Sequence, residues 1–212
     1  MKNLWRLRDF VVGMTGLFDK GAVTEVDVLR ATGRLLSALV AHDDWLPEEF
    51  AKPHAAHHQE YLLHCDPLER FSVVSVVLGP SQKMPVHDHL TWCLSGVLRG
   101  MEHFEEYRHE GEGRPMLKTG DHIGPQGEIE AVSPSIGDIH TISNAMPYRT
   151  TVSIHVFGAN IGVMKRHKFV LPTGEKQDYV SGYCNTVLPN FWNASPGHQP
   201  SRGSGMAGPL LI

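Results

Sequence analysis

The amino-acid sequence predicts an all-β core of the sandwich or jelly-roll type, preceded by two or three helices. Three observations support this fold class. Apolar side chains recur at helical spacing through residues 3–42. From residue 71 onward the pattern changes to short runs rich in β-branched residues, which is typical of strands. Gly, Pro and Asn residues separate these runs, as expected for a sandwich or jelly roll built from many short strands.

The first part of the chain carries the helical pattern. Residues 3–19 place apolar side chains on one helical face. The segment 24–27 can cap a second helix, whose apolar positions end near His42. Proline is tolerated in the first turn of a helix, so Pro47 favours a short third helix. We therefore expect a helical segment over residues 1–55, packed on the β core.

The β core is expected over residues 56–193. Its first clear strand is the apolar run 71–78, which is followed by the turn residues Gly79 and Pro80. This run is rich in valine, so it is expected to be buried. The final residues, 194–212, are expected to be loosely ordered. Seven further strands are expected, at residues 84–90, 92–99, 101–107, 115–119, 130–133, 139–143 and 150–157.

The composition argues against several classes of protein. The 212 residues are 41% hydrophobic and 20% charged, as in ordinary globular domains. A net charge of −4 argues against a dedicated nucleic-acid binder, which usually carries a basic face. The three cysteines form no Cys-x-x-Cys pair and are interpreted as reduced thiols. The chain has no signal-peptide pattern and no apolar run long enough to span a membrane. We therefore expect a cytoplasmic protein without nucleic-acid or membrane partners.

A set of three histidines carries the clearest chemical signal. His87 and His89 are separated by one residue, so on a β-strand their side chains point to the same face. His140 follows about fifty residues later and can complete a three-nitrogen set when the strands come together. Imidazole suits iron, copper, nickel and zinc. Three protein ligands also leave coordination positions open for a substrate, which is typical of a catalytic metal.

The residues around these histidines resemble the two motifs of the cupin family. The first motif is matched by Gly79, His87, His89 and Gly100. The second motif is matched by Pro134, Gly137, His140 and Asn144. The resemblance covers roughly residues 55–193. It implies a cupin jelly roll, also called a double-stranded β-helix, in which His87, His89 and His140 hold a metal ion.

The first motif departs from the general cupin pattern at Cys93, which stands where an acidic fourth ligand is usual. In this respect the chain resembles the thiol dioxygenases, the cysteine dioxygenase family. The resemblance implies Fe(II) held by three neutral histidines, with a small thiol and O2 as the partners of the site. The charge argument is consistent, because a site without a carboxylate keeps the full +2 charge and accepts a thiolate more readily.

A second strand strengthens this resemblance. Ser153, His155 and Phe157 alternate along the chain, so they face one side of a strand. In thiol dioxygenases this stretch is a Ser-x-His-x-Tyr relay beside the iron, which implies a catalytic role for Ser153 and His155. Here Phe157 replaces the tyrosine and cannot donate a hydrogen bond. The cysteine–tyrosine crosslink of animal cysteine dioxygenases therefore cannot form between Cys93 and position 157.

The stretch 155–169, together with residues 183–190, most resembles the bacterial 3-mercaptopropionate dioxygenases. In that branch an arginine at the position of Arg166 binds the substrate carboxylate, a task suited to the two parallel hydrogen bonds of a guanidinium. By spacing, the position that is Arg or Gln in relatives falls near Leu63 or His64. A histidine at position 64 could bind a second acidic group of the substrate.

The three-histidine set predicts a metal enzyme, and the resemblance implies an Fe(II)-dependent one that oxidises a small thiol carboxylate, such as 3-mercaptopropionate or cysteine, with O2 to its sulfinic acid. Two other functions stay open. One is a cupin with another metal and reaction, such as an isomerase or a ring-cleaving dioxygenase. The other is a small-molecule-binding cupin without catalysis, which Phe157 favours. The thiol, the pathway and the oligomeric state do not follow from the sequence.

Overall fold

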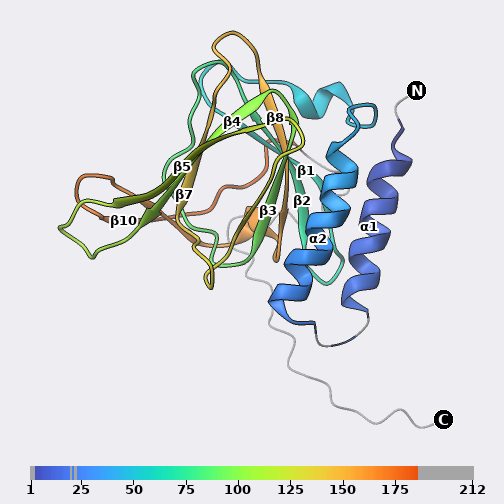
Figure 1. The fold of residues 1–212 in the computed structure, drawn as a ribbon, viewed down its shortest axis with the longest axis horizontal. Coiled ribbons are helices and arrows are strands. Elements are labelled where there is room, and N and C mark those ends of the chain that lie inside the picture. Colours follow the sequence, from blue (N-terminus) through green and yellow to red (C-terminus); the bar gives the residue numbers. More distant parts are fainter. Residues whose placement is uncertain (1–2, 20, 22, 186–212) are drawn as a thin grey trace.

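The computed structural model describes residues 3–19, 21 and 23–185. Two long helices, α1 (Trp5–Phe18) and α2 (Glu25–Val40), lie side by side against one face of the β core (Figure 1). A 3-10 helix, η1 (Glu48–Ala51), follows them, as the proline at position 47 predicts. The N-cap residue of α2 is Thr24, whose hydroxyl accepts the Asp27 N–H at 3.2 Å.

The described residues also form ten strands in two main sheets and one pair. The larger sheet has the order β1-β2-β8-β3-β6, and the smaller has the order β5-β4-β7. Strands β9 and β10 form an antiparallel pair, and a bridge between His87 and Lys168 joins this pair to the segment before β3. The strands are β1 (Gln59–Cys65), β2 (Ser72–Leu78), β3 (Cys93–Arg99), β4 (Met101–Arg108), β5 (Leu117–Pro125), β6 (Ile129–Val132), β7 (His140–Asn144), β8 (Thr151–Phe157), β9 (Arg166–Phe169) and β10 (Lys176–Tyr179). A second 3-10 helix, η2 (Ile161–Val163), precedes β9.

The two faces of the larger sheet pack against different partners. Along β2, Val73 belongs to the hydrophobic cluster that contains Phe10 and Leu36 of the helices. The next residue, Val74, belongs to a second cluster that also contains Phe104 of the smaller sheet. Successive side chains of a strand point to opposite faces. One face of the sheet is therefore covered by the helices, and the other lines the space between the two sheets.

Helix α2 approaches the sheet closely at Gly96 in the middle of β3. A Cβ atom at this position would lie 2.9 Å from Ile129 Cδ1, 3.0 Å from Val40 Cγ1 and 3.1 Å from Leu36 Cγ. A side chain here would push the helix away from the strand, because these neighbours are themselves packed. The helices and the β core consequently share one hydrophobic cluster. The division of the chain near residue 55 stays a prediction, and the expected C-terminal tail, 194–212, lies outside the described residues.

Most expected strands are present, and the differences have local causes. The expected strand over 84–90 is wrong, because this segment makes only isolated bridges. It contains Pro85, which has no N–H to donate, and Leu90, whose φ of 57° lies in the left-handed region. The expected strand 115–119 is longer and runs over Leu117–Pro125. Strands β1, β9 and β10 were not predicted as separate elements.

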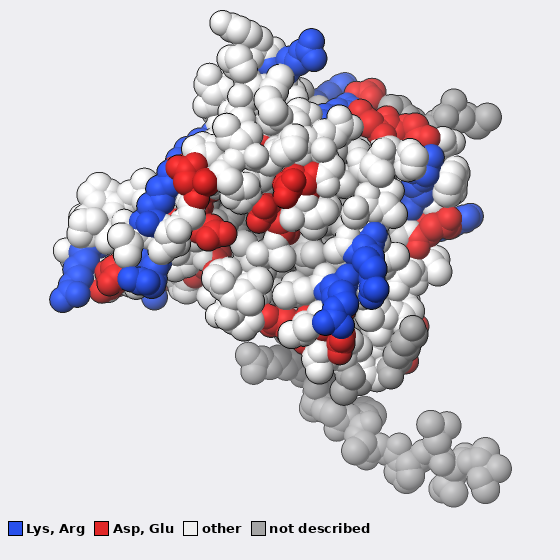
Figure 2. All heavy atoms as spheres, in the orientation of Figure 1, with Lys and Arg blue, Asp and Glu red and all other residues white. Residues whose placement is uncertain are grey.

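Among the described residues, no helix is long and apolar enough to cross a membrane. On the face drawn in Figure 2, acidic and basic side chains lie interspersed among uncharged ones. That face carries no extended area of a single charge sign among the described residues.

Candidate metal centre

Three buried histidines converge between the two sheets. His87 and His89 come from the segment that connects β2 to β3, and His140 is the first residue of β7. The Nε2 atoms of His87 and His89 lie 3.0 Å apart. One ring nitrogen from each of the three residues lies within 4.8 Å of the others, and all three side chains are buried. The histidines that the two motifs single out are therefore brought together.

Backbone hydrogen bonds hold the two histidine segments against each other. The N–H of His87 donates to the carbonyl of His140 at 3.0 Å, and the N–H of His140 donates back at 3.0 Å. The Asp138 carboxylate accepts the N–H groups of His89 and Leu90, the latter at 2.8 Å. These bonds stabilise the left-handed turn at Leu90 and so orient the ring of His89. Asp88 points away from the histidines and accepts the N–H of His167 at 2.8 Å.

Two of the three rings, those of His87 and His140, are held in the tautomer that a metal ion requires. Nδ1 of His87 donates to the Pro85 carbonyl at 2.9 Å, and Nδ1 of His140 donates to the Asp138 carbonyl at 3.1 Å. These bonds leave the Nε2 lone pairs directed at the shared centre. Burial lowers the pKa of His140 to about 4 and holds the pKa values of His87 and His89 well below their usual range. Three neutral, buried imidazoles are a donor set that fits a divalent transition-metal ion.

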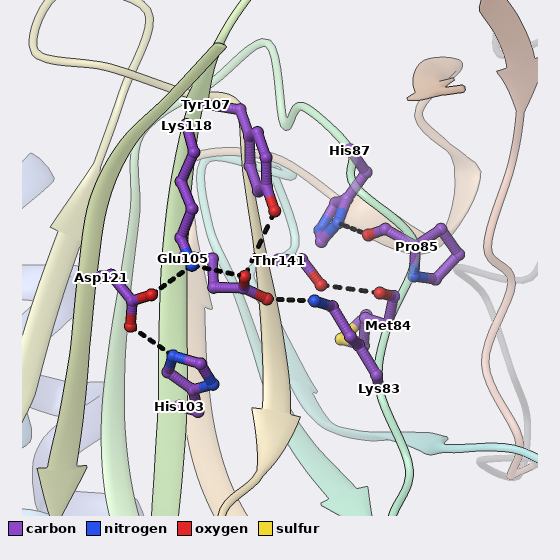
Figure 3. A network of polar contacts seen from close by, with 10 residues as sticks. All are labelled: Lys83, Met84, Pro85, His87, His103, Glu105, Tyr107, Lys118, Asp121 and Thr141. Carbon is purple, nitrogen blue, oxygen red and sulfur yellow. Dashed lines mark hydrogen bonds and ion pairs between the residues drawn. The ribbon is translucent and has the colours of Figure 1, made fainter. Parts of the chain in front are cut away.

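The segment that carries His87 is anchored to the smaller sheet (Figure 3). Lys83 forms an ion pair with Glu105 of β4, and Lys118 donates to the same carboxylate at 2.8 Å. Burial would raise the pKa of Glu105, but the two lysines outweigh it and lower the pKa to about 2. His103 and Asp121 extend this network, and together with Glu105 they also lie close enough to hold a metal ion. Lysine ammonium groups already neutralise both carboxylates, so we interpret this group as an ion-pair network.

Cys93 and Phe157 form an apolar wall beside the histidines. Cys93 begins β3 and pairs in register with Phe157 of β8, and both side chains are buried in the same cluster. The Phe157 ring lies edge-on to the His89 ring, with centroids 5.0 Å apart. Burial raises the pKa of the Cys93 thiol well above its usual value. The thiol is therefore protonated and does not belong to the group of ligand atoms formed by the three histidines.

Ser153 and His155 lie on the same face of β8, as their spacing predicts. The Ser153 hydroxyl is hydrogen-bonded to Nε2 of His155 at 2.9 Å, and both residues are buried. His155 and His140 line the same small cavity. Burial, with the neighbouring His140, lowers the pKa of His155 to about 3. This ring is neutral and has a fixed orientation beside the candidate metal centre.

Glu102 of β4 extends this polar line and was not predicted from the sequence. Its side chain is fully buried, and neither carboxylate oxygen has a hydrogen-bond partner among the described residues. Burial raises the pKa of Glu102 to about 7, although the nearby Ser153 hydroxyl opposes part of this effect. The available signal was its alternation with Phe104, which places both side chains on the inner face of β4.

Arg166 begins β9 and reaches the same cavity as the three histidines. Its side chain is only 2% exposed. One guanidinium nitrogen donates to the Ser181 hydroxyl at 2.9 Å, and Nε has no partner among the described residues. The guanidinium also lies over the Tyr179 ring, 4.8 Å from its centroid. A buried guanidinium with an unused donor is available for an anionic ligand.

The structure does not bring His64 to this cavity. A bulge interrupts the pairing of β1 with β2 between Leu62 and His64. Leu62 faces the space between the sheets. The His64 ring instead packs beside the ring of Phe71, which belongs to the cluster on the helix side, with the ring centroids 5.5 Å apart. Because a bulge inserts one extra residue, it places two consecutive side chains on one face and changes the alternation.

Glu60 occupies the place on β1 for which His64 was proposed. It lies two residues before Leu62 and therefore faces inward. Glu60 lines two adjacent cavities. The inner one, of about 10 Å³, is lined by the three histidines and Arg166. The outer one, of about 310 Å³, extends from His87 and Glu60 past Tyr179 and Ser181. A small molecule in the outer cavity therefore lies next to both Glu60 and His87.

The strand order, the two facing sheets and the histidines between them define the fold as the cupin double-stranded β-helix, with two N-terminal helices. This confirms the fold class that the sequence predicts. No family model matches the chain.

Several solved structures are similar to part of the chain. One is an uncharacterized conserved protein with a double-stranded β-helix domain from Klebsiella pneumoniae, with 16% identity, a TM-score of 0.42 and coverage of 56% of this chain and 90% of that one. Another is an RmlC-like cupin protein from Desulfovibrio desulfuricans, with 19% identity, a TM-score of 0.39 and coverage of 51% and 89%. At these values the similarity carries no information about activity.

Proposed function

We propose that the protein is an Fe(II)-dependent thiol dioxygenase that oxidises a small thiol carboxylate with O2 to its sulfinic acid. The observation that carries this proposal is the composition of the inner cavity. Three neutral imidazoles converge there without a carboxylate in the group of ligand atoms, and the buried Arg166 lies on the same wall. This composition suits a ligand with one anionic end at the metal centre and another at a guanidinium.

In this proposal His87, His89 and His140 hold the iron. When bound, Fe(II) would supply the redox chemistry that joins the thiol sulfur to O2. The overall reaction is balanced without another reductant: the sulfur atom loses four electrons, O2 gains them, and both oxygen atoms end on sulfur. Three neutral ligands leave the +2 charge of the ion uncompensated, which favours an anionic thiolate at this site.

The residues of the chain would act by binding and orientation. Arg166 would bind the substrate carboxylate through two parallel hydrogen bonds, and its unpartnered Nε is available as one of the donors. This contact would fix the distance between the carboxylate and the sulfur, so that the reacting atom is correctly placed. Ser153 holds the ring of His155, which would hold or move a proton at its free nitrogen. Phe157 and Cys93 would exclude water from this side of the cavity.

An oxygen electrode tests the proposal directly. Iron-loaded protein is supplied with 3-mercaptopropionate, cysteine, cysteamine and mercaptosuccinate in turn, and the sulfinate product is quantified. We expect one O2 consumed per sulfinate formed with at least one thiol. Metal analysis of protein purified without added metal is expected to find iron. A His140→Ala variant serves as the control and is expected to lose both iron and oxygen uptake.

The buried Phe157 favours a second candidate function, a cupin that binds a small molecule without oxidising it, because this ring cannot donate a hydrogen bond. The same experiment distinguishes the two functions. If the iron-loaded protein binds thiols but consumes no oxygen with any of them, the dioxygenase proposal is wrong. If metal analysis finds zinc or nickel in the purified protein and iron does not restore oxygen uptake, a different metal-dependent reaction is favoured.

A further inference from the structure

The cavity beside the three histidines contains a buried anion as well as a buried cation. Glu60 and Arg166 both line it, and their side chains are almost completely buried. The other residues that line it are histidines and apolar side chains. Apart from any metal ion, the fixed charges of the inner cavity are therefore one carboxylate and one guanidinium.

The carboxylate of Glu60 keeps its charge despite burial. Burial raises its pKa, but hydrogen bonding to His58 and the charge of Arg166 outweigh that effect, and the pKa is lowered overall. Nε2 of His58 lies 3.3 Å from a Glu60 oxygen. The Ser181 hydroxyl accepts a hydrogen bond from Arg166 and also stabilises the Glu60 carboxylate. Glu60 and Arg166 thus lie on either side of Ser181 without forming a direct ion pair among the described contacts.

An ionised carboxylate can only accept hydrogen bonds, so the group that complements Glu60 must be a donor and is best a cation. A thiol that carries only a carboxylate would satisfy Arg166 but bring a second negative charge toward Glu60. A thiol that carries both a carboxylate and an ammonium group would satisfy both residues. Mercaptosuccinate, with two carboxylates, would be the poorest match.

We propose that Glu60 is a specificity-determining residue that binds the ammonium group of the substrate, so that the site prefers a zwitterionic amino thiol to a purely anionic thiol carboxylate. This inference rests on the proposed function, because it assigns the substrate class of the same site. Arg166 binds the carboxylate of the amino thiol, and Glu60 binds its ammonium group from β1. Glu60 lines the outer cavity as well as the inner one.

Equilibrium binding tests this inference without turnover. Isothermal titration under argon measures the affinities of iron-loaded protein for L-cysteine and for 3-mercaptopropionate. We expect wild-type protein to bind L-cysteine more tightly. In Glu60→Gln, the affinity for L-cysteine is expected to fall about ten- to hundredfold, the range of a charged hydrogen bond, and the affinity for 3-mercaptopropionate to rise. A ratio of the two affinities that stays the same in the variant overturns the proposal and leaves Glu60 as a partner of His58 alone.

Two controls separate a specific effect from a general one. Glu112→Gln removes a carboxylate from an exposed loop and is expected to leave both affinities unchanged. Thermal unfolding of Glu60→Gln shows whether the variant is folded. If it is not folded, the comparison of the two ligands in wild-type protein still tests the proposal. Tighter binding of 3-mercaptopropionate than of L-cysteine by wild-type protein overturns it. The titrations are repeated with Zn(II) in place of iron. A failure of oxygen uptake with every thiol therefore refutes the dioxygenase function, whereas an unchanged affinity ratio refutes the role of Glu60.

Discussion

Phe157 is the residue at which the site departs most clearly from the pattern that its neighbours suggest. Its ring stacks on His155 with centroids 5.8 Å apart and also contacts His89 edge-on. The side chain is 4% exposed and belongs to the apolar cluster between the two sheets. The polar line formed by Ser153 and His155 therefore has no phenol donor at its end.

We expect Phe157→Tyr to raise kcat with the preferred thiol severalfold, because a phenol beside His155 adds a proton donor to the cavity. The change adds one oxygen atom and keeps the ring, so we expect metal content to stay the same. Steady-state oxygen uptake over a range of pH provides the measurement. Identical kcat and pH profiles in the two proteins would show that position 157 is only a packing position.

Glu102 is the second residue whose environment sets a testable property. Burial raises its pKa to about 7, from an ordinary value of 4.5. The folded protein thus keeps this proton up to about pH 7, whereas the unfolded chain loses it near pH 4.5. The stability that Glu102 contributes is complete below pH 4.5 and is lost as the pH rises toward 7. Above pH 7 the folded protein carries a buried charge that costs about 3 kcal/mol.

We expect Glu102→Gln to increase the free energy of unfolding by about 1–3 kcal/mol at pH 8 and to change it little at pH 5. The gain is smaller than the full cost because the buried amide also lacks partners. Urea unfolding of both proteins at the two pH values provides the measurement. Glu106→Gln, at an exposed position further along the same strand, is the control. An effect of equal size at both pH values would contradict the raised pKa.

At the scale of the element, the bulge in β1 decides which side chains reach the cavity. It reverses the alternation between Leu62 and Cys65, so that Leu63 and His64 both lie toward the helices. Glu60 precedes the bulge and keeps its inward direction. The one extra residue of the bulge is therefore the reason that Glu60 lines the cavity while His64 packs on the helix side.

We expect His64→Leu to leave KM and kcat for the preferred thiol unchanged, since His64 does not line either cavity. Nε2 of His64 is buried without a partner among the described residues, so the apolar replacement is expected to raise the free energy of unfolding by about 1 kcal/mol. Oxygen uptake and urea unfolding of the purified variant are the measurements. A rise in KM without loss of stability would return His64 to the substrate site.

At the scale of the whole molecule, the candidate metal centre lies where distant segments of the chain meet. His87 and His89 precede β3, His140 begins β7, and Arg166 begins β9. The Asp88–His167 and His87–His140 contacts hold these segments together across the barrel. An ion bound by all three histidines joins the two strand connections and binds only the folded chain. Metal binding is therefore expected to stabilise the complete fold.

We expect saturating Fe(II) or Zn(II) to raise Tm and a chelator to lower it again, with about 2.7 kcal/mol of stabilisation when the free ion is at 100 times its Kd. His140→Ala is expected to abolish the shift in Tm. His54→Ala, in the exposed segment before β1, is expected to retain it. Calorimetry under argon provides the measurement for iron. An equal Tm shift in wild-type and His140→Ala protein would place the ion elsewhere.

The sequence alone determined the jelly-roll class, the two N-terminal helices, the histidines of the candidate centre and the shared face of Ser153 and His155. These follow from short-range patterns, because periodicity and turn residues act within one element. His89 and His140 are about fifty residues apart, and they could be assigned to one site only because each lies in a recognisable motif.

The tertiary structure decided the rest of the site. It places His64 beside Phe71, lines the inner cavity with Glu60 and Arg166, and buries Glu102 between the sheets. The bulge in β1 leaves no clear mark in local composition, and the burial of a charged side chain depends on strands that are distant in sequence. A charged residue ordinarily indicates a solvent-exposed position. Glu60 was therefore recognisable as part of this cavity, and Glu102 as a buried carboxyl group, only after the two sheets had been placed face to face.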